Sequence, residues 1–169
     1  MPEAIKKYVR YVDAMNRFIG LGVTYMIFAM MAVLLYASFM KTFFLPSLWT
    51  LEFAQFMMVA YFLLGGAFSM QEEGHVRMDL LYGRYKPKTQ AGIDVVTIFF
   101  LIIYLGFLLY GGISSTSYAL QYGEESYSAW APKMAPIKII MVIGVIMMLL
   151  QSFSTLFKDI AKVRGMEIS

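Results

Sequence analysis

The chain has no cysteine and one histidine, and charged residues make up only 15% of its 169 positions. Without cysteine there can be no thiolate zinc site, iron–sulfur cluster, disulfide framework or cysteine nucleophile. Haem in a membrane bundle commonly takes two histidines on facing helices, and this chain offers only His75, in a predicted loop. We therefore expect no metal and no cofactor in this chain.

Catalytic patterns are also missing from the sequence. It has no recognisable nucleophile–base pair, no phosphate-binding loop and no pair of acids at catalytic spacing. The chain is not expected to be an enzyme. Its basic balance, with a net charge of +3, is typical of the cytoplasmic loops of a membrane protein, and no nucleic-acid partner is predicted.

Apolar residues are abundant, at 60% of the chain, which is more than a soluble domain of this size can bury. A helix needs about 20 apolar residues to cross the hydrocarbon core of a membrane. Four runs are long enough. The sequence therefore predicts an all-α integral membrane protein, a single domain over residues 1–169, with transmembrane helices at about 18–40, 49–70, 95–118 and 139–157.

The basic residues predict how these spans are oriented. Eleven of the 14 lysines and arginines lie before the first span, between the second and third, or after the fourth. By the positive-inside rule, the N- and C-termini and the second loop are cytoplasmic. Trp49 and Trp130 then both fall on the outer side, where indole rings anchor helices at headgroup depth.

Two short segments have the pattern of amphipathic helices on the inner surface. Near the N-terminus an apolar stripe alternates with polar positions that include Asp13. Between the second and third spans, a similar stripe precedes Pro87. Basic amphipathic helices bind anionic leaflets, so membrane lipids are expected partners. The stripes are Ile5, Tyr8, Val9, Val12 and Met15, and Met78, Leu81, Tyr82 and Tyr85.

Glu52 is the one acid within an apolar run, and an acid in a membrane span is a candidate functional residue. It could be a proton or cation site, pair with a cation on a partner subunit, or sit hydrated at the outer interface near Lys41. It lies only three residues after Trp49, and Gln55 follows on the same helical face. This shallow polar stripe favours a docking or hydrated position over a conduction path.

Other candidate positions lie at the ends of the spans. The loop after the second span holds His75, Arg77 and Asp79, which are either a solvated turn or a bonded cluster that ends the helix. The loop before the fourth span is a candidate docking site for an external protein and contains Glu124, Glu125 and Trp130. Gln151, Ser152, Ser154 and Thr155 make the inner end of the fourth span polar.

These residues together resemble one family. Trp49-x-x-Glu52 opens the second span, Gly65-Gly66 lies before its end, and Gly74-His75-Val76-Arg77-x-Asp79-Leu80 follows. The combination is similar to the small membrane (Q, DctQ-like) subunit of tripartite ATP-independent periplasmic (TRAP) transporters. The resemblance covers nearly the whole chain.

The resemblance implies a three-part uptake system in the bacterial inner membrane. A periplasmic substrate-binding protein (P subunit) captures an organic anion and makes transient contact. A large membrane (M) subunit moves the anion with a sodium gradient, and the small subunit binds that subunit and enlarges its scaffold. By the resemblance, Trp49, Glu52, His75, Arg77 and Asp79 are structural or subunit-interface positions. We expect the same of Gln55, from its helical face, and of Gly65 and Gly66.

A second hypothesis is a self-sufficient small exporter in which Glu52 couples transport to protons. It predicts homodimers and loss of drug resistance on Glu52→Gln.

Overall fold

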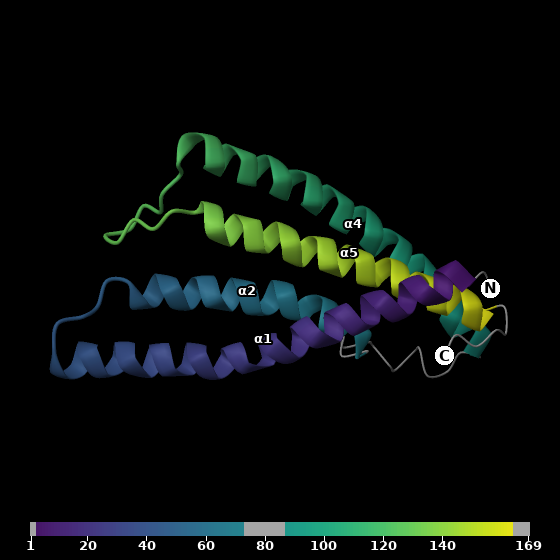
Figure 1. Ribbon diagram of the computed structural model, residues 1–169, viewed down its shortest axis with the longest axis horizontal. Coiled ribbons are helices and arrows are strands. Elements are labelled where there is room, and N and C mark those ends of the chain that lie inside the picture. The colour runs from purple at the N-terminus through teal and green to yellow at the C-terminus, as the bar shows by residue number, and fades with distance from the viewer. Residues whose placement is uncertain (1–2, 73–86, 164–169) are drawn as a thin grey trace.

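The computed structural model describes residues 3–72 and 87–163, and these ranges form four helices (Figure 1). They are α1 (Glu3–Phe43), α2 (Thr50–Gln71), α4 (Pro87–Tyr122) and α5 (Ala135–Val163). Each includes a segment long and apolar enough to cross a membrane, which confirms the prediction of four helices able to span one. Their orientation across the membrane remains a prediction.

The helices form two hairpins, α1 with α2 and α4 with α5, and α5 joins them. In Figure 1, α5 lies between α4 and α2, and the N-terminal end of α1 crosses it. Accordingly α5 contacts each of the other three helices. In its most apolar window 33% of residues are buried, against 11% in α1 and in α4. The chain's own core therefore lies along α5, and the other helices leave most of their apolar surface uncovered.

The first helix is longer than the predicted span. The N-terminal segment around residues 5–15, expected to be an amphipathic helix on the membrane surface, runs without a break into the span, and α1 reaches 41 residues. No proline interrupts this stretch. Val9 and Val12, from the predicted apolar stripe, are buried inside the protein. The second predicted surface helix, about residues 77–85, lies outside the described residues.

Local sequence explains where α4 begins and ends. Pro87 is its first residue, a position where a missing N–H costs no helical hydrogen bond. After Tyr122, Gly123 has a φ of 61°, which glycine tolerates best. The N–H of Glu124 then donates to the carbonyl oxygen of Ala119 at 3.2 Å, closing the last turn. The chain is thereby turned towards α5.

Candidate functional site

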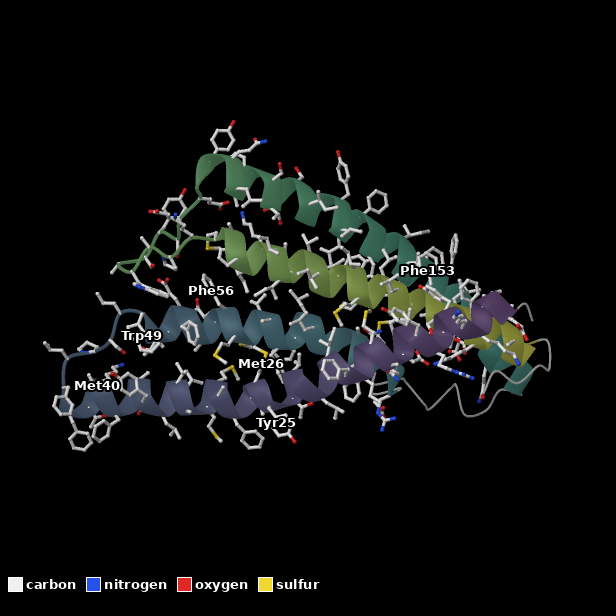
Figure 2. All side chains as sticks on the ribbon, viewed as in Figure 1. Tyr25, Met26, Met40, Trp49, Phe56 and Phe153 are labelled. Atoms are coloured by element: carbon white, nitrogen blue, oxygen red, sulfur yellow. The ribbon has the colours of Figure 1, made fainter. Side chains whose placement is uncertain are left out.

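The start of α2 is an aromatic and hydroxyl-rich corner. Trp49 precedes the helix, and its ring lies 6.1 Å from that of Tyr36 on α1 and 6.0 Å from that of Phe53 (Figure 2). Thr50 is buried and shares a 2.7 Å hydrogen bond with Ser47. Trp49 thus packs α1 against α2 while part of its ring stays exposed, as an interfacial anchor would.

Glu52 is half-buried at this corner, and Gln55 is exposed. The Glu52 Oε2 atom is shielded from solvent, and within the described ranges it accepts no hydrogen bond. A shielded carboxylate oxygen is costly unless a donor reaches it. Among residues 3–72 and 87–163, no group of three or more histidine and acid side chains gathers as a metal site would need. Glu52 therefore has an oxygen that can accept a hydrogen bond from a donor outside the described residues.

Gly65 and Gly66 lie at two different helix contacts. A Cβ at Gly65 would lie 3.6 Å from Cγ1 of Val23 on α1. A Cβ at Gly66 would lie 2.9 Å from Sδ of Met148 on α5, closer than side chains normally approach. Both positions are occupied by contacts within this chain. The structure thus places them between α2 and its neighbours in the bundle, where lack of a side chain lets helices approach.

The inner-loop residues His75, Arg77 and Asp79 lie outside the described residues. Just before them, the N–H of Glu72 donates to the carbonyl oxygen of Phe68 at 3.1 Å, where α2 ends. The predicted role of the loop in ending α2 and redirecting the chain stays a prediction.

The loop between α4 and α5 is folded on itself. The N–H of Ser126 donates to the carbonyl oxygen of Pro132 at 3.0 Å, and Glu125 pairs with Lys133 in an antiparallel bridge. Glu124 forms a part-buried ion pair with Lys138 of α5. The loop is thus a short hairpin held to the bundle at its base.

The exposed tip of this hairpin is aromatic. Tyr127 is fully exposed, and Trp130 is 42% exposed. Ala131, next to Trp130, has a φ of 45°, a left-handed conformation that is uncommon for a residue with a side chain. Of the three loop residues singled out in the sequence, Glu124 is held inward, whereas Glu125 and Trp130 remain accessible.

A buried polar cluster joins α1 to α5 and was missed in the sequence. Asn16 Nδ2 donates to Gln151 Oε1 at 2.6 Å, and Gln151 Nε2 donates to Asp13 Oδ1 at 3.1 Å. Ser154 Oγ donates to the same Asp13 oxygen at 3.2 Å, and Lys158 forms an ion pair with Asp13 Oδ2. Asn16, Gln151 and Ser154 are fully buried. These side chains lock the first turns of α1 onto the end of α5.

The cluster corrects the expected position of Asp13 and explains why the inner end of the fourth span is polar. Asp13 was assigned to the polar side of a surface helix, but its carboxylate faces α5 and takes part in the cluster. The polar inner end of the fourth span, noted in the sequence, faces α1, because Gln151 and Ser154 both bond to Asp13. Residue spacing was the signal in the sequence that could have revealed the cluster. One helical face carries Asp13 and Asn16, and another carries Gln151, Ser154 and Lys158.

Most of the polar contacts described above connect one helix to another. The sides of the bundle expose many large apolar side chains. The family model for tripartite ATP-independent periplasmic transporters, DctQ component, matches residues 10–162. No curated protein matches the chain. The match confirms the resemblance found in the sequence, and this family is one of transporter components, not of enzymes. The chain therefore belongs to the DctQ component family of the tripartite ATP-independent periplasmic transporters and is a multi-pass membrane protein.

Proposed function

We propose that this chain is the small subunit of a sodium-coupled transporter that takes up an organic anion. In this proposal it forms one membrane domain in the bacterial inner membrane, with both termini cytoplasmic. It binds the large membrane subunit and enlarges the scaffold against which that subunit works. A periplasmic binding protein delivers the anion.

The observation that carries this proposal is how little of the spanning helices the chain itself buries. Only 11% of the most apolar windows of α1 and α4, and 17% of that of α2, is buried. The buried cluster of Asp13, Asn16, Gln151, Ser154 and Lys158 is used to tie α1 to α5. A small unit held together inside and apolar on its sides suits a scaffold that adds to a larger membrane protein.

Glu52 is the residue we propose for contact with the large subunit. Its Oε2 atom is shielded and accepts no hydrogen bond within the described residues. Glu52→Ala is expected to lower co-purification with the large subunit about tenfold, since a hydrogen bond to a charged group contributes about 1.5 kcal/mol or more. Pull-down of the tagged large subunit after co-expression, with membrane insertion checked separately, measures this.

Glu52→Gln serves as the matched variant, because it keeps the acceptor oxygen and removes the charge. If the donor is a cation, Glu52→Gln should behave like Glu52→Ala. Unchanged assembly and unchanged uptake with both variants would make Glu52 a hydrated bystander. Sodium-driven anion uptake by this chain alone in vesicles would contradict the scaffold role. Proton-driven drug export by the chain alone, abolished by Glu52→Gln, would favour the exporter hypothesis.

The hairpin between α4 and α5 is the surface we propose for transient contact with the binding protein. Trp130 is exposed on a hairpin fixed at its base by the Glu124–Lys138 ion pair. Trp130→Ala is expected to lower uptake about threefold to tenfold at low binding-protein concentration, because exposed aromatic side chains often dominate such contacts.

Raising the binding-protein concentration should restore uptake by Trp130→Ala, and co-purification with the large subunit should not change. Tyr110→Ala is the control, since Tyr110 is an exposed aromatic residue on the side of α4. An equal loss of uptake in both variants would point to a general defect and reject the docking role.

A further inference from the structure

The first five turns of α1 have one face buried inside the protein and one face exposed. One face, with Val9, Val12 and Asn16, is buried inside the protein. It packs towards α5, where Asn16 bonds to Gln151 and the Tyr8 hydroxyl donates to the carbonyl oxygen of Leu150 at 3.2 Å. Val9 and Val12, in the middle of the apolar stripe that the sequence assigned to a membrane surface, are thus covered by protein, and the exposed face of α1 is the one free to meet the membrane.

The exposed face of α1 is basic. Lys6, Lys7, Arg10 and Arg17 are all exposed. At about 100° per residue, Arg10 and Arg17 point within about 20° of each other, whereas Val9 and Asn16 point roughly 100° away. Lys158 is neutralised by Asp13, but within residues 3–72 and 87–163 no ion pair is formed by these four cations. An open cleft of about 480 Å³ is lined by Glu3, Lys6, Lys7 and Arg10.

The basic face continues along α1 as an exposed aromatic and apolar stripe. Phe18 is 81% exposed, next to Arg17, and Leu21, Tyr25 and Phe28 follow on the same face. Figure 2 shows Tyr25 pointing away from α2. From Arg17 to Phe28 the helix rises about 16 Å, at about 1.5 Å per residue. That length equals about half of the roughly 30 Å hydrocarbon core, or one leaflet.

We propose that this face of α1 binds an anionic phospholipid of the inner leaflet. The headgroup phosphate binds Arg10 and Arg17, with Lys6 and Lys7 adding positive charge around the cleft. One acyl chain lies along Leu21, Tyr25 and Phe28. The order along the helix, from cations to an exposed stripe of aromatic and apolar side chains, matches the order of a phospholipid from phosphate to tail. An acidic peptide would satisfy the cations but would leave the stripe below Arg17 unused.

The inference rests on the proposed function only in naming the inner leaflet, which requires a cytoplasmic N-terminus. Binding of the lipid to the purified protein does not depend on orientation, on the large subunit or on transport. Failure of the lipid assay and failure of the scaffold proposal are therefore distinguishable.

The test is native mass spectrometry of the purified full-length chain titrated with phosphatidylglycerol or phosphatidylcholine. We expect tighter binding of phosphatidylglycerol, and about a tenfold to thirtyfold loss in the double variant Arg10→Gln/Arg17→Gln. Lys41→Gln/Lys133→Gln removes the same charge from exposed positions elsewhere and should leave binding unchanged. Inorganic phosphate at millimolar concentration should not displace the lipid, because it lacks the tail.

Glu3→Gln should change lipid affinity in the opposite direction, because it removes a negative charge from the cleft that three of the cations line. It should raise phosphatidylglycerol affinity about threefold, an increase that misfolding cannot produce. Equal losses in the Arg10/Arg17 and Lys41/Lys133 variants would show a bulk charge effect and overturn the proposal. So would displacement by free phosphate, or a double variant that binds lipid normally but no longer co-purifies with the large subunit.

Discussion

Replacing Gln151 with leucine is expected to lower the free energy of unfolding of the isolated chain by about 2 to 4 kcal/mol. Gln151 is fully buried and bonds to both Asn16 and Asp13. Leucine fills the space but leaves the buried Asn16 Nδ2 donor without its acceptor, and Asn16 Oδ1 already accepts no hydrogen bond within the described residues. Reversible unfolding in mixed detergent micelles, followed by helical circular dichroism, measures the change.

The double variant Asn16→Leu/Gln151→Leu separates lost hydrogen bonding from lost packing. Replacing both partners by apolar groups is often nearly neutral, so the double variant should be more stable than Gln151→Leu alone. Gln55→Leu is the control, because Gln55 is exposed on α2, and it should change stability by less than about 0.5 kcal/mol. A double variant whose loss equals or exceeds the sum of the two single losses would contradict the role assigned to the cluster.

Gly144→Ala is expected to destabilise the chain by about 1 to 3 kcal/mol, although alanine favours helices. Gly144 lies where α5 meets α2. A Cβ there would lie 2.9 Å from the Cβ of Leu63 and 3.0 Å from its carbonyl carbon and oxygen. Backbone atoms cannot rotate away, so the two helices must separate and lose contacts along their length. The same unfolding assay measures the loss.

Gly106→Ala in α4 is the matched control for Gly144→Ala. A Cβ at Gly106 would meet nothing within 4 Å, so the substitution should be neutral or slightly stabilising. Gly144→Val should be worse than Gly144→Ala, because its larger side chain extends further into α2. Equal behaviour of Gly144→Ala and Gly106→Ala would mean that α2 and α5 do not approach as closely as described.

The adjacent glycines show where sequence spacing stops being informative. The sequence marks Gly65 with Gly66 on the second span, but it does not say which neighbour each one faces. That depends on the rotation of α2 about its axis, and one residue changes the direction by about 100°. The structure turns Gly65 towards Val23 of α1 and Gly66 towards Met148 of α5. Contacts with two helices at once decide the rotation.

Asp13 shows the same limit for polar residues. Its neighbours Lys6, Lys7 and Arg10 suggest a polar face, and from local spacing Asp13 belongs to that face. Only the position of α5, some 140 residues later, supplies Gln151, Ser154 and Lys158 and makes an inward-facing carboxylate favourable. A charge is accepted at a helix interface when partners compensate its lost hydration.

The number of helices able to span a membrane and the family could be predicted from the sequence alone, because they depend on local apolar length and on short motifs. Tertiary structure decided that α1 is one helix, that α5 forms the centre of the bundle and that Asp13 is held between them. These features depend on which faces meet. In a membrane, apolar side chains are satisfied by lipid on every side, so close packing and buried hydrogen bonds choose the faces.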